Sequence, residues 1–310
     1  MSFEAVASGA AARSYLFAPG NNEKLLERVF LAGADAVVLD LEDAVPLQDK
    51  DWARDLVSRL LGAQSAGMSD ASQGPAIYVR VNGLESGRTR DDILAVVSPA
   101  LRGIRLPKAE DTDSVREVAS WLAEAERSRG LTEGSVRLDC TIESARGLLA
   151  AAEIARVDRR VGALVFGHVD YCLDVGAEPG TEGWEILYAR SYVVAASRFA
   201  GIPAPVDGAY TRLRDPEGLR RSALAAKRLG YFGKSAVHPE QLAIIHQVFT
   251  PTAEEVEAAQ TMVTAYERAE ITGTGAIRLD SGQFVDRAVV LRAYRTLALA
   301  SRQPNQVERG

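Results

Sequence analysis

The stretch LDLEDAV (39–45) places three carboxylates, Asp40, Glu42 and Asp43, at the end of an otherwise apolar run. A carboxylate buried without a partner costs roughly several kcal/mol. We therefore expect these acids to face a cation or a polar cavity at the end of a buried strand.

Other β-rich runs also end in polar side chains. They are Arg80 and Asn82 in IYVRVN, Lys108 in GIRLPK, Glu143 in VRLDCTIES and Asp170 in ALVFGHVD. Because strands alternate faces with period two, an apolar face packed on helices turns the polar face inward. So many charges at strand ends favour an active site over core stabilisation.

The residue types indicate the chemistry of such a site. Several carboxylates without a nearby Cys or His cluster suit a hard cation, Mg²⁺ first and Mn²⁺ second. The planar guanidinium of Arg80 suits a substrate carboxylate or a developing oxyanion. A structural interpretation remains open from spacing alone, with Glu143 and Asp170 as ordinary strand-end caps and Arg80 paired with Glu42.

The elements that would position these residues alternate along the chain. Helical patterns separate the β-rich runs, and Gly130, Gly201 and Gly230 stand where helices would end. The alternation predicts a (β/α)₈ TIM barrel with a C-terminal helical extension. An open doubly wound sheet is the alternative, although no G-x-G-x-x-G follows the first strand. The expected strands are 14–19, 36–42, 77–82, 103–108, 136–144, 163–170, 204–208 and 233–239.

Three regions are expected. Residues 1–12 would form a flexible tail, 13–250 the catalytic barrel, and 251–310 an extension that packs on a neighbouring subunit. The extension begins with a helical pattern over 252–270 and continues with an expected hairpin, IRLDSGQFVD, before a last helix.

Composition excludes several classes of protein. With 36 basic and 42 acidic residues among 310, the net charge is −6, which argues against a nucleic-acid partner. The two cysteines, Cys140 and Cys172, provide neither a disulfide framework nor a thiolate zinc site. No apolar run approaches the roughly 20 residues of a membrane span, and the first residues do not read as a signal peptide. We therefore expect a cytoplasmic protein without a membrane partner.

The ordered motifs carry a family resemblance. They are RSYLFAPGN, GADAVVLDLEDAV, YVRVNG, IRLPKAE, TIESARGLL, FGHVDYCLDVG, GLRRSALAAKRLGYFGKSAVHPEQL and GTGAIRLDSGQFVD. From Arg13 to about residue 300 the chain resembles the citrate lyase β-subunit-like branch of the HpcH/HpaI aldolase superfamily, which contains malyl-CoA and citramalyl-CoA lyases.

The resemblance implies a Mg²⁺-dependent carbon–carbon lyase. The expected reaction is the reversible Claisen-type cleavage of a 3-hydroxyacyl-CoA thioester into an acyl-CoA and a 2-oxo acid. A homotrimer or a larger homo-oligomer is implied as well. Two alternatives stay open: an acyl-CoA thioesterase or malate-synthase-like activity in the same site, and a citrate lyase β-type subunit that acts only within a complex.

The resemblance also implies roles for individual residues. Glu143 and Asp170 match the metal ligands, and Arg80 matches the arginine that holds the substrate. Glu42 and Asp43 match acids that bind metal-bound water, and Asp286 matches an acid/base supplied by an adjacent subunit. The residues that match contacts to coenzyme A are Phe17, Asn22, Arg28 and Lys108. The chain departs from the family at VDRA (285–288), where members often carry VDxP. Asn22 and Arg28 stand where relatives often have Arg and Lys.

Overall fold

The computed structural model describes residues 12–67, 74–271, 276–278, 282 and 284–301. They fall into two compact units, one ending at His246 and the other beginning at Gln247. The first unit carries every candidate site residue except Asp286. The predicted tail, apart from Ala12, lies outside the described residues, and the predicted domain limits stay predictions.

The first unit is built on a parallel sheet whose described strands follow the order β6-β5-β4-β3-β2-β1-β7. Its two edges meet through the segment after Pro205, because Val165 of β6 bridges to Val206 and Lys234 of β7 bridges to Asp207. The TIM-barrel prediction is confirmed, although the strand expected over 204–208 is reduced to these two bridges. The strands are β1 (Ser14–Pro19), β2 (Ala36–Asp40), β3 (Ala76–Arg80), β4 (Leu101–Leu106), β5 (Arg137–Ile142), β6 (Val161–Phe166) and β7 (Lys234–Ala236).

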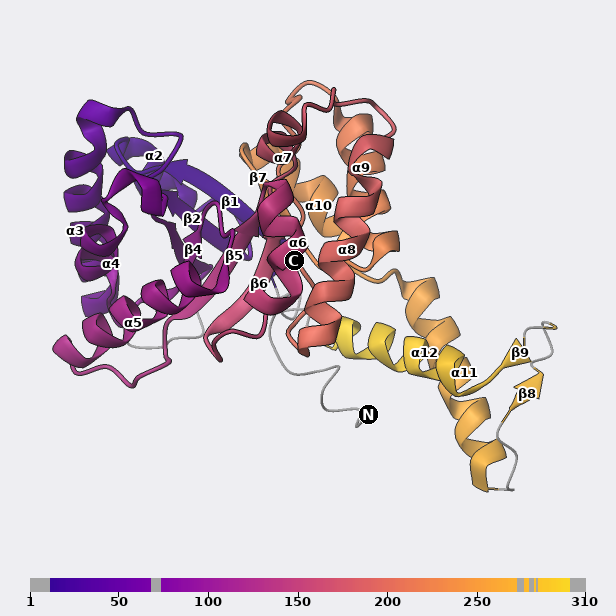
Figure 1. Cartoon of the computed structure of the whole chain (residues 1–310). Helices are drawn as coiled ribbons and strands as arrows, with labels where there is room; N and C mark the ends of the chain where they lie inside the picture. Colours follow the sequence, from indigo (N-terminus) through magenta and orange to yellow (C-terminus); the bar gives the residue numbers. More distant parts are fainter. Residues whose placement is uncertain (1–11, 68–73, 272–275, 279–281, 283, 302–310) are drawn as a thin grey trace, which may run out of the picture. The chain divides into compact units, whose positions relative to one another are not determined.

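Helices follow the strands and cover the outside of this sheet (Figure 1). Successive outer helices contact one another in the order α3, α4, α5, α6, α8 and α9. Gly201 and Gly230 end α8 and α9 in the left-handed conformation, at φ of 75° and 114°, as predicted for helix ends. The helices are α2 (Glu23–Val29), α3 (Lys50–Gly67), α4 (Thr89–Val96), α5 (Thr112–Ser128), α6 (Ala145–Ile154), α7 (His168–Val175), α8 (Trp184–Ala200), α9 (Pro216–Leu229) and α10 (Leu242–Phe249), with 3₁₀ turns at Leu47–Asp49, Leu84–Ser86 and Pro239–Gln241.

The barrel interior changes from apolar to polar along the strands. An apolar cluster contains Val38 of β2 and Tyr78 of β3, together with Tyr15, Ala36, Val165 and Val206. Two residues further along the same strands stand Asp40 and Arg80, which are Cα partners. Because residues two apart share a face, the polar groups lie at the carboxyl ends of the strands, where barrel enzymes place their chemistry.

The second unit is a helix, a hairpin and a helix. It contains α11 (Ala253–Ile271), the antiparallel pair β8 (Ile277–Arg278) and β9 (Phe284–Val285), and α12 (Arg287–Ala300). Val263, Tyr266, Val285 and Val290 belong to its small apolar core. The C-terminal helical extension is therefore confirmed, and its packing on a neighbouring subunit stays a prediction.

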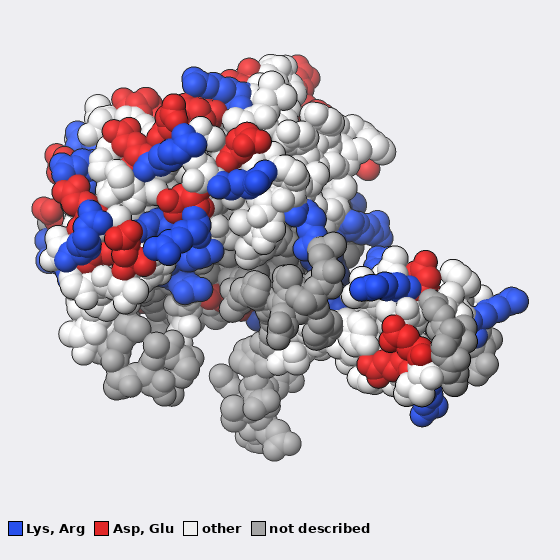
Figure 2. Space-filling view, turned by 60° about the horizontal axis from the view of Figure 1, so that its bottom comes forward, with Lys and Arg blue, Asp and Glu red and all other residues white. Residues whose placement is uncertain are grey.

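The surface agrees with the composition. On the face that Figure 2 shows, Lys and Arg side chains are intermixed with Asp and Glu. None of the described helices combines the length and apolar composition that crossing a membrane requires.

Candidate active site

A pocket of about 170 Å³ opens at the carboxyl ends of the barrel strands. Its walls come from β1, β3, β4, β5, β6 and β7, from the first turn of α7 and from residues 208–211. Phe17, Arg80, Arg105, Thr141, Glu143 and Asp170 are among the residues that line it. The structure thus gathers four of the predicted site residues, Phe17, Arg80, Glu143 and Asp170, in one cavity.

Two carboxylates share this pocket. Glu143 follows β5 directly and is 6% exposed, while Asp170 stands in the first turn of α7. Glu143 Oε1 accepts a hydrogen bond from the Lys108 backbone N–H at 2.7 Å. Burial, followed by the nearby charge of Asp170, raises the pKa of Glu143 to about 8 despite this bond. The carboxylate of Glu143 therefore stands in a site where a positive charge would be strongly favoured.

Gly167 makes room for Glu143. A Cβ at position 167 would clash with the Glu143 side chain, so any larger residue would displace the carboxylate. The glycine also precedes α7 and so places Asp170 one short turn away.

The two carboxylates fit a hard divalent cation. Within the described part of the chain, neither forms an ion pair with a Lys, Arg or His side chain. No group of three His, Cys, Asp or Glu side chains suited to a metal occurs among the described residues. Mg²⁺ commonly takes one or two carboxylates and fills its other positions with water and substrate oxygens. Glu143 and Asp170 meet that requirement, whereas a site made wholly of protein ligands is not offered.

Arg80 is held by the acids of the LDLEDAV stretch. Its Nε and Nη2 donate to the two carboxylate oxygens of Asp40 at 2.7 and 2.6 Å, and its Nη1 lies 2.7 Å from Glu42 Oε2. Burial alone would lower the pKa of Arg80, but Asp40 and Glu42 raise it above its ordinary value. A guanidinium has five N–H donors, so the two hydrogen bonds to Asp40 and the ion pair with Glu42 fix its orientation and do not use all of its donors.

Glu42 and Asp43 both lie beside the Arg80 guanidinium, but Glu42 is buried and Asp43 is exposed. Glu42 is 5% exposed, whereas the Asp43 side chain is 61% exposed and its carboxylate lies 3.7 Å from Arg80 Nη1. Burial raises the pKa of Glu42 to about 7, although the charge of Arg80 opposes this. Lys50 Nζ binds the backbone carbonyls of Leu41 and Glu42 at 2.8 and 2.7 Å and so fixes the turn that carries the acids. The contact seen for both acids is with Arg80; their predicted contact with metal-bound water stays a prediction.

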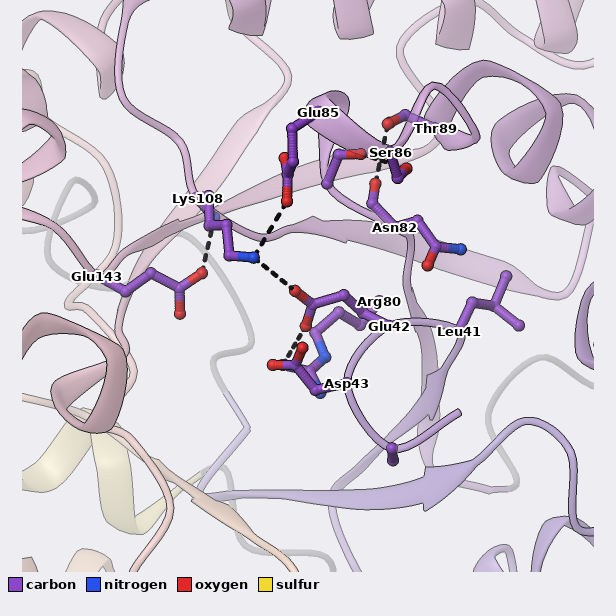
Figure 3. A network of polar contacts seen from close by, with 12 residues as sticks. Leu41, Glu42, Asp43, Arg80, Asn82, Glu85, Ser86, Thr89, Lys108 and Glu143 are labelled. Atoms are coloured by element: carbon purple, nitrogen blue, oxygen red, sulfur yellow. Dashed lines mark hydrogen bonds and ion pairs between the residues drawn. The ribbon is translucent and has the colours of Figure 1, made fainter. Parts of the chain in front are cut away.

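Lys108 lies between Glu143 on one side and Glu42 and Glu85 on the other (Figure 3). Its Nζ points toward Glu85 at 3.1 Å and Glu42 at 3.6 Å, while its backbone N–H holds Glu143. The residue has a φ of 49°, a left-handed conformation that costs an ordinary side chain roughly 1–2 kcal/mol. That strained backbone is what aims the Lys108 N–H at Glu143.

Of the remaining predicted contacts to coenzyme A, the structure places Phe17 in the pocket and Asn22 and Arg28 outside its lining. Phe17 lies in the pocket, where its ring stacks under the guanidinium of Arg80 at 5.2 Å. Asn22 caps α2 and accepts a hydrogen bond from the Leu25 N–H, and Arg28 is exposed in the last turn of that helix. Helix α2 does not contribute to the pocket lining among the described residues.

Asp286 belongs to the second unit. Its carboxylate caps α12 by accepting a hydrogen bond from the Val289 N–H at 3.0 Å. The cap explains why an Asp begins this helix. The acid/base role implied by the family motif requires an adjacent subunit and stays a prediction.

The sequence interpretation missed Arg105. This residue of β4 is 1% exposed, lines the pocket, and is the Cα partner of Arg80. The signal was available, because Arg105 alternates with Ile104 and Leu106 in a strand whose apolar face meets the helices. Thr141 and Ser235, on β5 and β7, line the same pocket.

Comparison with known proteins places this site in a family. The HpcH/HpaI aldolase/citrate lyase family matches residues 13–239, which include every candidate residue of the barrel. The chain belongs to this family. It is 38% identical over 289 residues to the citrate lyase subunit beta of Leuconostoc mesenteroides, covering 93% of each chain. It is 30% identical over 300 residues to the mitochondrial citramalyl-CoA lyase of Homo sapiens, covering 93% of this chain and 85% of that protein. The chain is thus a lyase, in a family that acts on thioesters of coenzyme A.

A solved relative has the same fold. The protein CitE from Mycobacterium tuberculosis, in complex with magnesium, acetoacetate and coenzyme A, superposes with a TM-score of 0.75 at 26% identity, over 94% of this chain and 99% of that one. The similarity therefore extends over both units of the chain.

Proposed function

We propose that this protein is a Mg²⁺-dependent carbon–carbon lyase that cleaves a 3-hydroxyacyl-CoA thioester reversibly into an acyl-CoA and a 2-oxo acid. One observation carries the proposal: Glu143 and Asp170 share a pocket with a rigidly held arginine and pair with no cationic side chain among the described residues. The Mycobacterium relative, whose complex contains magnesium, acetoacetate and coenzyme A, supports this assignment.

Glu143 and Asp170 would hold the metal. When bound, Mg²⁺ supplies Lewis-acid polarisation of the oxygens on the 2-oxo-acid half of the substrate. The Lys108 N–H fixes the orientation of the Glu143 carboxylate, and Gly167 leaves the space that it occupies. Glu42 and Asp43 would accept hydrogen bonds from water on the metal and keep Arg80 in place.

In the bond cleavage, Arg80 would stabilise the enolate and Asp286 would transfer a proton to it. In cleavage, the 3-hydroxyl would give its proton to solvent water, the bond between C2 and C3 would break to leave the carbonyl of the 2-oxo acid, and the electron pair of that bond would enter the thioester as an enolate. The N–H groups of Arg80 that are not hydrogen-bonded to Asp40 would stabilise the enolate oxygen. Asp286 of an adjacent subunit would give the enolate carbon its proton and remove it in the reverse direction.

The coenzyme A portion would bind at the mouth of the pocket. Phe17 lines the pocket, and Lys108, whose backbone N–H holds the pocket residue Glu143, carries a charge suited to a phosphate. Asn22 and Arg28 would contribute from α2. This binding mode and the acid/base role of Asp286 both agree with a homotrimer or a larger homo-oligomer, in which one subunit completes the site of the next.

The test is a cleavage assay with malyl-CoA, citramalyl-CoA and citryl-CoA, following release of glyoxylate, pyruvate and oxaloacetate with and without Mg²⁺. We expect metal-dependent turnover that Glu143→Ala abolishes. Gly167→Ala should lower turnover about 10- to 100-fold, because the new Cβ displaces Glu143. Gly62→Ala is the matched control, since a Cβ on that α3 residue would meet no atom within 4 Å. Release of coenzyme A without a 2-oxo acid would identify a thioesterase instead.

Failure would be equally clear. If no thioester is turned over in a metal-dependent way and Glu143→Ala behaves like the wild-type protein, the lyase proposal is wrong.

A second candidate is a citrate lyase β-type subunit that acts on a citryl thioester only within a complex. The 38% identity to the Leuconostoc subunit favours it. Assaying the purified chain alone separates the two candidates, because turnover of free acyl-CoA supports the first and an inert chain that requires partner subunits supports the second.

A further inference from the structure

Lys108 contacts a proposed metal ligand through its backbone and other acids through its side chain. Its backbone N–H donates to Glu143 Oε1 at 2.7 Å, so the residue starts beside the metal site. Its Nζ points toward Glu85 at 3.1 Å and Glu42 at 3.6 Å (Figure 3). The Lys108 side chain is 43% exposed, and the stem of a lysine is flexible. The position of its ammonium group therefore depends on which carboxylates hold it.

Glu85 is shaped by its neighbours for this contact. It stands in the 3₁₀ turn Leu84–Ser86, directly after Gly83 and before Gly87. A Cβ on Gly83 would clash with the Glu85 carboxylate, so only a glycine lets that carboxylate fold back over the turn. Ser86 Oγ donates to the Gly83 carbonyl at 2.6 Å, and Gly87 ends the turn at a φ of 68°. The local sequence thus holds the Glu85 carboxylate beside Lys108.

The base of the turn is anchored in the core. Asn82 and Asp92 are 2% and 0% exposed, and Asn82 Nδ2 donates to Asp92 Oδ2 at 2.7 Å. Thr89, also buried, donates its hydroxyl group to the Asn82 carbonyl at 2.9 Å. The Glu85 side chain is 59% exposed, but its backbone is carried by this buried anchor. Glu85 is therefore placed more firmly than its exposure alone implies.

Two other cations near the acids are fixed by different partners. Arg80 has its two hydrogen bonds to Asp40, and Lys50 Nζ binds the carbonyls of Leu41 and Glu42. Of these three cations, Lys108 has the most exposed contact and an acid-facing ammonium on a flexible stem. It is thus the cation of the three that can move toward Glu143.

An ammonium group that moved there would compete with a metal ion. Glu143 and Asp170 stand where a positive charge is strongly favoured, and an ammonium group meets that requirement as a divalent cation does. Glu85 gives the ammonium a carboxylate partner on the other side of Lys108. Because both side chains are exposed, this ion pair adds little to stability. Its main consequence is the position of the charge.

We infer that Glu85 is a positioning residue that keeps the Lys108 ammonium off Glu143 and Asp170 and thereby raises the affinity of their site for a divalent cation. The inference deepens the proposed function and rests on it for the assignment of Glu143 and Asp170 to the metal. Glu85 touches neither the metal ligands nor the pocket lining among the described residues, so it acts through Lys108.

The experiment measures metal binding without any thioester. Mn²⁺ is titrated into the full-length protein, and the free ion is quantified by its electron paramagnetic resonance signal. The variants are Glu85→Gln, Lys108→Met and the double variant, and Lys108→Met keeps the backbone N–H that holds Glu143. Glu143→Ala reports whether the ion uses the proposed site. Glu124→Gln is the matched control, because Glu124 is an exposed glutamate on α5 that pairs with Arg90 at 2.8 Å.

Glu85→Gln should weaken Mn²⁺ binding by about 3- to 5-fold, the range that an exposed ion pair can supply. Lys108→Met should bind Mn²⁺ at least as tightly as the wild-type protein. The double variant should lie within about 2-fold of Lys108→Met, because the competing ammonium is gone. Glu124→Gln should leave the affinity unchanged. The melting temperature of Glu85→Gln should change by less than about 3 °C, which separates this role from a structural one.

Two results would overturn the inference. In the first, Glu85→Gln binds Mn²⁺ as tightly as the wild-type protein. In the second, Glu85→Gln weakens binding equally with and without Lys108, which would mean that the Glu85 charge acts on the metal directly.

The outcome is distinguishable from that of the lyase proposal. Binding that Glu143→Ala abolishes and Glu85→Gln leaves unchanged contradicts the inference alone. The expected pattern of affinities without any thioester cleavage supports the inference and contradicts the lyase. A wild-type protein that binds no Mn²⁺ or Mg²⁺ would contradict both.

Discussion

Arg80 and Arg105 occupy neighbouring positions in the barrel but differ in how many polar partners each guanidinium has. They are Cα partners on β3 and β4, and both guanidinium groups lie within about 5.5 Å of the Phe17 ring. Arg80 has a bidentate contact with Asp40 and a further one with Glu42, whereas Arg105 has one hydrogen bond, to Ser235. Burial alone therefore does not decide what an arginine does. The supply of acceptors on the neighbouring strand decides it: Arg80 has two acids beside it, and Arg105 has one hydrogen bond among the described residues.

The largest expected effect concerns Asp40. Asp40→Ala removes the bidentate partner of Arg80 and the acceptor of the Glu42 and Ala44 N–H groups. We expect the free energy of unfolding to fall by about 3–5 kcal/mol, because a largely buried charge loses its partner. Denaturant unfolding measures this. Asp43→Ala is the control and should change stability by less than about 1 kcal/mol, since Asp43 is exposed. Equal losses in the two variants would show that Arg80 does not depend on Asp40.

An intermediate effect is expected at Ser235. Ser235→Ala takes away the hydrogen bond of Arg105 and should cost about 1.5–3 kcal/mol of unfolding free energy, since the donor is charged and buried. Ser120→Ala, which removes an exposed hydroxyl group on α5, should cost less than about 0.5 kcal/mol. A loss as small as that of the control would mean that Arg105 finds another acceptor, and the contrast with Arg80 would weaken.

The smallest effect is a pH dependence at Asp139. Burial, only partly offset by Arg105, raises the pKa of this carboxyl group to about 6, compared with about 3.9 in an unfolded chain. The folded state favours the protonated form, so the stability contributed by this group is complete below about pH 4 and is lost as pH rises through about 6.

Between pH 5 and pH 7 the wild-type protein should therefore lose about 1 kcal/mol more unfolding free energy than Asp139→Asn. Denaturant unfolding of both proteins at the two pH values measures the difference. Parallel losses would show that Arg105 holds Asp139 ionised.

Much of the fold could be predicted because its signals are local. The alternation of Asp139 and Thr141 with Leu138 and Cys140 placed the polar face inward, and Gly201 and Gly230 ended their helices as expected. The strand expected over 204–208 was wrong in extent, since only Val206 and Asp207 bridge to the sheet. A short apolar run carries no local sign of how many partners it will pair with.

In the candidate site, too, the local features could be predicted from the sequence and the long-range pairings could not. The sequence by itself determined which residue types stand at the strand ends, because period-two alternation and the motifs around Glu143 and Asp170 need no long-range information. Only the tertiary structure decided how they pair. Asp40 meets Arg80, and Arg105 stands opposite Asp139, through the register of parallel strands that are about 25 to 40 residues apart in the chain. Pairings at such separations are set by how the whole barrel packs, and this is why one arginine is fixed by acids while its neighbour has two buried donor atoms without a hydrogen-bond partner among the described residues.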